Sequence, residues 1–267
     1  MDVRTYYKNA ARISFIVGIV LMGIVGVYAV SSIWFGLDWL LLIEMGSVSL
    51  VLIAISFIQR NRYNNVTVEN QAPNLEDELL LTRDHFICKY LPSPNMKISL
   101  FQSDGHAIGE IRDAKKQWWK WMIPGSFFAF LPIKYELVDQ KQNVVGKYVK
   151  KAGLKAKVDI LNKSGEKIGM YEEPLVQTMK QKKGRIIDQN GVEILWVEQM
   201  GMVQGARIKN EGGAEQARIQ CGWMPRDYSN KFKELNLPIV TISDEMSNEE
   251  RIMAFAIFLT LLSYWRN

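Results

Sequence analysis

The sequence predicts a mainly β protein with membrane helices: an N-terminal two-helix transmembrane hairpin, then a closed antiparallel barrel of about twelve strands around a hydrophobic C-terminal helix. Three observations lead to this fold class. Two long uncharged runs open the chain, short alternating segments separated by turn residues fill its middle, and a uniformly apolar segment ends it. These features divide the 267 residues into a hairpin (1–60), a polar linker (61–78) and a barrel (79–267).

The first 60 residues contain two segments that are long enough to cross a bilayer. Residues 13–37 carry no charge, and residues 39–58 carry only Glu44. Three basic residues precede the first segment, two follow the second and none lies between them, so the positive-inside rule predicts a multi-pass protein of the cell membrane with both termini in the cytoplasm. A cleaved signal peptide is the competing interpretation of residues 13–37, but their uncharged run exceeds the usual length of about 7 to 15 residues.

Glu44 is the one charged residue inside either predicted span. An acid at membrane depth is a functional candidate, because burying its charge in hydrocarbon is costly. It lies six residues from Asp38 in the connecting loop, about 9 Å along a helix, so its side chain can also bend toward the interface. Both interpretations of Glu44 stay open at this point.

Residues 61–78 are polar and end in an acidic cluster, which is typical of a linker. Beyond Leu79, alternating apolar and polar residues separated by Asp-Gly, Ser-Gly and Asn-Gly turns predict an antiparallel sheet. The clearest hairpins span residues 97–112, 134–150, 157–171 and 184–198. Further strands are expected at residues 86–91, 118–123, 127–131, 202–209, 216–222 and 238–242.

The C-terminal segment predicts a helix that is buried on every side. Ser247 and Glu250 form a capping box, and residues 252–265 carry no charge. These fourteen residues rise about 21 Å, less than the roughly 30 Å of bilayer hydrocarbon, so a helix inside the protein is favoured over a third span. A helix about 10 Å across does not fit an eight-stranded barrel, so the enclosing sheet needs about a dozen strands.

This arrangement resembles the tubby C-terminal fold, which tubby-like proteins share with phospholipid scramblases and the LURP-one-related family. The resemblance rests on hairpin motifs such as NKSGEKIG at residues 162–169 and on the terminal helix after residues 238–247, and it covers residues 79–267. It implies a barrel threaded by the last helix and, because tubby-like proteins bind phosphoinositide headgroups, an anionic lipid as ligand. The calcium-binding segment of scramblases has no counterpart here, so the resemblance does not extend to calcium activation.

Residues that carry catalysis or bind metals are scarce. The two histidines are His85 and His106, and the two cysteines are Cys88 and Cys221. The pair His85 and Cys88 has metal-ligand spacing, but no second close pair completes a site, so packed side chains are the favoured interpretation. We therefore expect no enzyme activity, cofactor or metal. The part of the chain beyond residue 62 holds 28 basic and 25 acidic residues, a balance that also argues against nucleic-acid binding.

The strongest surface signal is the segment KKQWWKW at residues 115–121, which interleaves lysine with tryptophan. Indole and ammonium groups together favour the headgroup region of a membrane, although the aromatic rings of a barrel strand can also pack inward. A second basic run includes Lys150 and Lys151 and contains no acid. The predicted lipid-binding residues are Lys115, Lys116, Trp118, Trp119, Lys120, Trp121, Lys150 and Lys151.

Two functions follow as hypotheses. The first is a non-enzymatic, membrane-anchored cytoplasmic module that binds anionic lipid headgroups or a protein partner at the inner membrane surface. The second is scramblase-like lipid transport, in which the two spans and Glu44 form the path.

Overall fold

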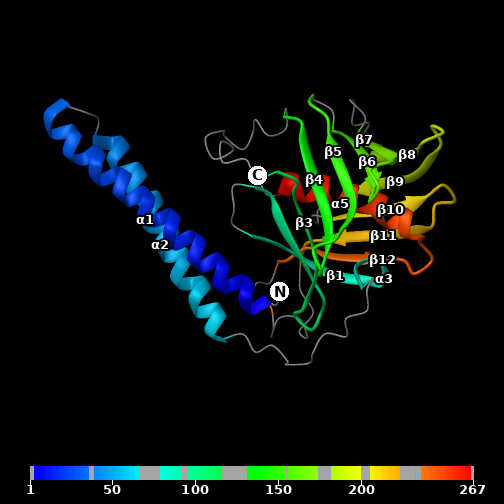
Figure 1. Ribbon diagram of the computed structural model, residues 1–267, viewed down its shortest axis with the longest axis horizontal. Helices are drawn as coiled ribbons and strands as arrows, with labels where there is room; N and C mark the ends of the chain where they lie inside the picture. The colour runs from blue at the N-terminus through cyan, green and yellow to red at the C-terminus, as the bar shows by residue number, and fades with distance from the viewer. Residues whose placement is uncertain are drawn as a thin grey trace.

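The computed structural model describes residues 3–35, 39–65, 79–91, 95–115, 131–153, 156–173, 182–199, 205–222, 232 and 236–265. Within these residues, two long N-terminal helices lie beside a closed barrel of twelve antiparallel strands, and a C-terminal helix fills the barrel (Figure 1). The fold class predicted from the sequence is confirmed.

The N-terminal helices are α1 (Val3–Phe35) and α2 (Trp39–Asn65), and α2 continues past the predicted boundary at residue 60. The stretches Arg4–Ser31 and Trp39–Asn64 are long and apolar enough to cross a membrane, with mean hydropathies of 2.6 and 2.3. Many of their large apolar side chains are exposed, which is unusual for a surface that meets water.

Small residues bring α1 and α2 together. Ser49 is fully buried, and its hydroxyl donates a hydrogen bond of 2.7 Å to the carbonyl oxygen of Gly18. A Cβ atom at Gly18 would lie 2.8 Å from Cγ1 of Ile53, so only glycine permits this approach. Close packing of small residues and interhelical hydrogen bonds hold helices together in membranes. The sequence alone did not predict this contact, because neither helix contains a G-x-x-x-G motif.

Each barrel strand pairs with its neighbours in the chain, and β12 closes the barrel onto β1, where Phe86 lies opposite Val240. The four hairpins predicted from the sequence are the pairs β2–β3, β4–β5, β6–β7 and β8–β9. The predicted strand at residues 118–123 and nearly all of that at 127–131 lie outside the described residues. The strands are β1 (His85–Tyr90), β2 (Lys97–Phe101), β3 (Ala107–Asp113), β4 (Ile133–Asp139), β5 (Val144–Lys150), β6 (Lys157–Asn162), β7 (Lys167–Glu172), β8 (Lys182–Asp188), β9 (Glu193–Gln199), β10 (Gly205–Asn210), β11 (Glu215–Gln220) and β12 (Ile239–Ile242).

Tight turns join the strands at one end of the barrel, which we call the turn end. In the β6–β7 turn, the side-chain oxygen of Asn162 accepts a hydrogen bond from the amide of Glu166, and Gly165 has a φ of 89°. Gln142 holds the equivalent left-handed position in the β4–β5 turn, with a φ of 70°, where the sequence pattern has glycine elsewhere. The same accepting role is played by Asp139, Asp188 and Asn210.

The opposite end of the barrel, which we call the loop end, carries the connections between β1 and β2, β3 and β4, β5 and β6, β7 and β8, β9 and β10, and β11 and β12. The connections at residues 114–132 and 151–156 therefore leave the barrel at the same end. Most of the residues in the longer connections lie outside the described residues. The two basic runs predicted to meet lipid thus begin at one end of the barrel.

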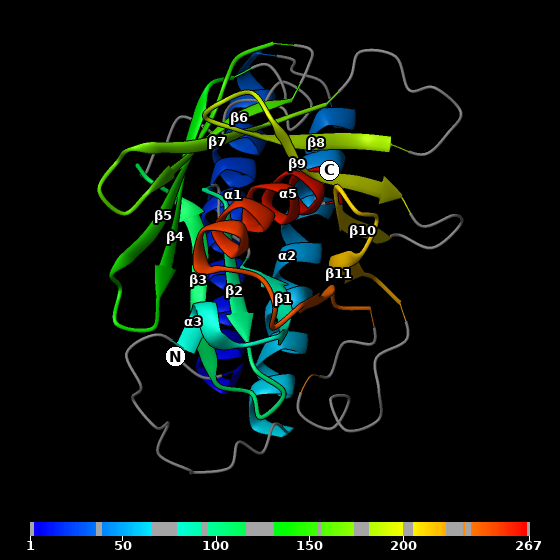
Figure 2. The same cartoon turned by 90° about the vertical axis from the view of Figure 1, so that its right-hand side faces the viewer.

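Helix α5 (Asn248–Trp265) enters the barrel at the turn end and runs toward the loop end, with the strands around it in Figure 2. A short helix, α3 (Leu79–Thr82), packs near its start. The predicted capping box is confirmed, because Ser247 and Glu250 exchange hydrogen bonds through their side chains and amides. Phe255 is fully buried and stacks on Phe86 of β1, with ring centroids 5.3 Å apart. The terminal helix is therefore the core of the barrel.

Arg251 fastens the first turn of α5 to the turn end. Its side chain is 5% exposed and pairs with Asp84 at 3.0 Å. The same guanidinium donates to the carbonyl oxygens of Arg83, Ser243 and Met246. A guanidinium with this many partners is well suited to hold separate backbone segments together.

Candidate functional site

The base of α1 packs against the outer face of the barrel. Tyr6 and Tyr7 are buried together with Ile87 of β1 and Phe101 of β2, and the rings of Tyr6 and Phe101 meet edge to face at 6.0 Å. Phe232 extends this cluster from the chain that follows β11, with its ring centroid 5.7 Å from that of Phe101. The hairpin is therefore joined to the barrel by a packed apolar contact as well as by the chain.

A buried lysine lies at the centre of this contact. Lys89 of β1 is 1% exposed, and its Nζ atom lies 3.6 Å from the ring centroid of Tyr7 and 4.5 Å from that of Tyr6. A cation over aromatic faces is attracted by their negative quadrupoles, and the attraction is greatest where water is excluded. A second contact of the same kind places the guanidinium of Arg4 in α1 4.8 Å from the ring of Tyr63 in α2.

This contact explains the burial pattern of β1. Phe86 and Cys88 face the barrel interior, whereas Ile87 and Lys89 face outward and are covered by α1. In Figure 1 the hairpin leaves the barrel toward the upper left, and the last turns of α5 point to the same left-hand side. Because α5 runs from the turn end to the loop end, the loop end lies on the side toward which the hairpin extends.

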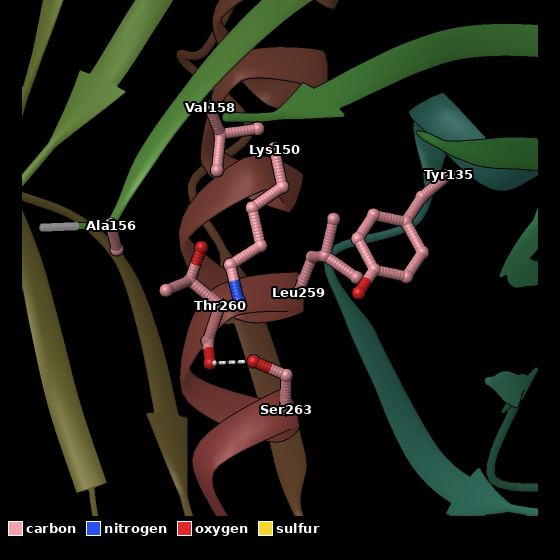
Figure 3. A pocket seen from close by; sticks show the side chains of 7 residues that line it. All are labelled: Tyr135, Lys150, Ala156, Val158, Leu259, Thr260 and Ser263. Atoms are coloured by element: carbon pink, nitrogen blue, oxygen red, sulfur yellow. Dashed lines mark hydrogen bonds between the residues drawn. The ribbon is translucent and has the colours of Figure 1, made fainter. Parts of the chain in front are cut away.

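The loop end contains a small pocket between β4, β5, β6 and the last turns of α5 (Figure 3). Lys150 reaches into it, and its amine points toward Thr260 of α5. Tyr135 and Ser263 also line the pocket, which leaves about 10 Å³ for the centre of a water molecule. This is room for about one water, so the pocket does not hold a larger ligand as it stands.

Lys150 therefore lies at the mouth of the barrel interior, whereas the sequence had predicted a lipid-binding lysine on the surface. Burial lowers the pKa of its amine below the ordinary value of 10.5, and the nearby Glu173 opposes this effect. The charged form of the amine is thus less stable in this position than it would be in water. An anion that reaches the loop end would improve these surroundings.

Two of the other predicted lipid-binding lysines, Lys115 and Lys151, belong to the described residues and lie near Lys150. Lys115 is exposed and follows β3, and the amide of Ala114 donates to the carbonyl oxygen of Lys134, which places this part of the chain beside the start of β4. Lys151 is exposed beyond β5 and pairs with Asp159 of β6 at 2.9 Å. The basic run that contains Lys151 has no acid in sequence, but the neighbouring strand supplies one. The remaining predicted residues, Lys116, Trp118, Trp119, Lys120 and Trp121, lie outside the described residues.

Glu44 is exposed on α2. Its backbone carbonyl accepts a hydrogen bond of 2.7 Å from the hydroxyl of Ser47, one turn further along the helix. In a membrane this carboxyl group would face lipid or another polypeptide.

The histidine and cysteine residues do not form a reactive site in the described part of the chain. His85 faces outward and contacts the hydroxyl of Thr241 at 3.2 Å, whereas Cys88 faces the core, so the two cannot bind one metal ion. Burial raises the pKa of Cys88, with a smaller contribution from Cys221, and burial raises the pKa of Cys221 to about 11. Both thiols are therefore protonated at neutral pH and weakly nucleophilic. No group of three metal-binding side chains occurs among the described residues.

Sequence reasoning missed Tyr6, Tyr7, Lys89 and Arg251. The signal for Lys89 was present in the segment HFICKY, where the apolar Ile87 lies on the outward face, between His85 and Lys89, of a strand whose inward face is apolar too. Such a strand needs a cover on each side. The tyrosine pair beside Lys8 reads equally well as an interfacial aromatic belt, so the sequence did not indicate a partner for it.

The described residues define a class of protein: two helices able to cross a membrane, joined to a closed antiparallel barrel that contains its own C-terminal helix. No family model matches this chain, and no curated protein matches it. Among solved structures, the chain is similar to an Arabidopsis thaliana protein determined by X-ray crystallography, with 9% sequence identity and a TM-score of 0.40. That similarity covers 67% of this chain and 88% of the other.

Proposed function

We propose that this chain is a non-enzymatic, membrane-anchored module of the tubby-like superfamily whose barrel binds anionic lipid headgroups at the inner surface of the cell membrane. Both termini lie in the cytoplasm in this proposal, as the basic residues at the hairpin base favour. The observation that carries it is the position of Lys150, whose amine is partly buried at the loop end, on the side toward which the hairpin extends.

Three features support an anionic ligand at the loop end. Lys115 and Lys151 are exposed beside Lys150, and each lysine near an anionic surface contributes about 1 kcal/mol of attraction. The lowered pKa of Lys150 means that a negative ligand would relieve an unfavourable environment. The base of α1 is packed on the barrel, so the loop end keeps its direction relative to the hairpin.

We expect short-chain anionic phospholipid to stabilise the full-length protein in detergent, and zwitterionic phospholipid to leave it unchanged. A ligand at 100 times its Kd stabilises by about 2.7 kcal/mol, which corresponds to a rise in Tm of about 5 to 10 °C for a domain of this size. Thermal unfolding with added phosphatidylserine, a phosphoinositide, phosphatidylcholine or inorganic phosphate measures this and separates a lipid from a free phosphate.

A matched pair of double variants locates the site. Lys115→Glu with Lys151→Glu changes the loop end and should abolish the rise in Tm, whereas Lys141→Glu with Lys163→Glu changes two exposed turn-end lysines and should retain it. Equal stabilisation by anionic and zwitterionic lipid, or equal loss in both double variants, would contradict the proposal.

Scramblase-like lipid transport is the second candidate, and the exposed position of Glu44 on α2 favours it. A polar group on the outer face of a span is where a moving headgroup would pass. Dithionite quenching of labelled lipid in proteoliposomes separates transport from binding, because a binding module leaves the inner-leaflet label protected. An unchanged scrambling rate in Glu44→Gln would remove this residue from the path.

A further inference from the structure

We infer that the base of α1 is an orientation latch: a noncovalent joint that holds the barrel to the membrane hairpin and directs its loop end at the bilayer, without help from the connecting chain. We define the latch as Tyr6, Tyr7 and Ala10 of α1 together with Lys89 and the apolar residues around it on the barrel. Its directing role rests on the proposed function, because direction matters only if the loop end meets lipid.

The latch has the composition of a specific interface. Tyr7 and Ala10 are fully buried, and Tyr6 is 3% exposed, so one side of α1 is covered over a little more than one turn. The aromatic rings meet edge to face rather than in loose contact, which is the arrangement that adds attraction beyond burial alone. Buried aromatic anchors of this kind dominate the affinity of protein interfaces.

Lys89 gives the latch one position. An apolar helix can slide along an apolar surface with little change in energy, but the Nζ atom of Lys89 lies near the rings of Tyr6 and Tyr7 at once. Shifting α1 by one residue would rotate those rings away from the amine by about 100° and break both cation–aromatic contacts. A buried polar group can fix the register between packed elements in this way.

The position of the latch places the barrel directly beneath the membrane. Tyr7 lies six residues, about 9 Å, before Ile13, where the uncharged run of α1 begins. That distance slightly exceeds the headgroup layer, which is about 5 to 8 Å deep on one side of a bilayer. The barrel face formed by β1, β2 and β3 is therefore held just outside the headgroups.

Cutting the connecting chain tests whether the barrel stays bound to the membrane hairpin through the latch alone. A protease site placed between residues 66 and 78 of the full-length protein, reconstituted in purely zwitterionic vesicles, allows cleavage after assembly. We expect the cleaved barrel to remain with the vesicles in high salt. Release of the wild-type barrel on cleavage would overturn the latch.

Two variants locate the latch on its two sides. Tyr7→Ala changes only the helix, and Lys89→Glu changes only an outward-facing position of the barrel; each should increase release about tenfold or more, because each removes a desolvated cation–aromatic contact. Lys8→Ala alters an exposed residue of α1, and Lys134→Glu alters an exposed residue of β4, away from the latch; neither should increase release. Circular dichroism of the released barrel confirms that it is folded. Equal retention in all four variants would exclude the role of Lys89 and Tyr7.

Lipid composition separates this inference from the proposed function. Retention in zwitterionic vesicles that resists salt supports the latch, whatever the loop end binds. A barrel that stays only on anionic vesicles and is removed by salt would overturn the latch while leaving lipid binding by the loop end intact.

Discussion

Phe255→Asp is expected to unfold the whole barrel and not merely its C-terminus. Phe255 is fully buried, stacks on Phe86 and contacts Phe258 edge to face at 5.8 Å. Removing a buried phenylalanine costs about 3 to 5 kcal/mol, and an unpaired carboxylate in the same place costs several more, which together approach the stability of an ordinary domain. Near-ultraviolet circular dichroism and denaturant unfolding of the detergent-solubilised protein measure the loss.

The control for this variant is Val192→Asp in the β8–β9 turn. Val192 is 53% exposed, so an aspartate there should change the free energy of unfolding by less than about 0.5 kcal/mol. If Phe255→Asp kept a cooperative unfolding transition and lost only the signal of the last helix, α5 would not be the core of the barrel.

Arg251→Ala is expected to lower the free energy of unfolding by about 3 kcal/mol. The guanidinium is buried, pairs with Asp84 and satisfies three backbone carbonyl groups at the turn end, so its loss leaves several acceptors without their donor. Because Asp84 is partly exposed, water replaces part of this loss, and the effect stays below that of Phe255→Asp.

A surface arginine provides the comparison. Arg218 on β11 pairs with Glu215 at 2.6 Å, but both side chains are about one-third exposed. Ion pairs of this kind contribute at most about 1 kcal/mol, so Arg218→Ala should be mild. Urea unfolding of both variants measures the difference, and equal losses would mean that Arg251 does not fasten α5.

Much of the fold could be predicted from the sequence because a local sequence pattern indicates each helix, strand and turn. The turns at Gly165 and Gly191 fix the hairpins, and the capping box at Ser247 fixes the start of α5. The turns and the helix start depend on residues close together in the chain, where periodicity and turn chemistry are informative. The number of strands was predicted differently, from the size of the apolar helix that the barrel has to enclose, and this needed no knowledge of individual contacts.

The contacts between distant segments could not be predicted in the same way. Lys89 and Tyr7 lie about eighty residues apart, and the sequence around either residue does not indicate a contact with the other. Lys150 was predicted to lie on the surface because it belongs to a basic run without acids. The sequence did not show that its side chain enters the barrel interior at the loop end of β5. Lys151, its neighbour, points away and meets Asp159 from the next strand. The alternation of residues along a strand predicts which side chains share a face. Only the closed barrel shows which of those side chains point toward its interior at the loop end.

The distance of each barrel end from the bilayer reports directly which end of the barrel faces the membrane. Ala152 is exposed in the connection after β5 at the loop end, and Ala214 is exposed in the β10–β11 turn at the turn end. Each is replaced by a spin-labelled cysteine in full-length protein that carries Cys221→Ser, because Cys221 is only partly buried.

In nanodiscs whose lipids carry a headgroup-bound nickel chelate, we expect strong relaxation of the label at residue 152 and little at residue 214, because the loop end faces the bilayer. Equal relaxation at both positions, or the reverse order, would contradict a barrel that faces the membrane with its loop end.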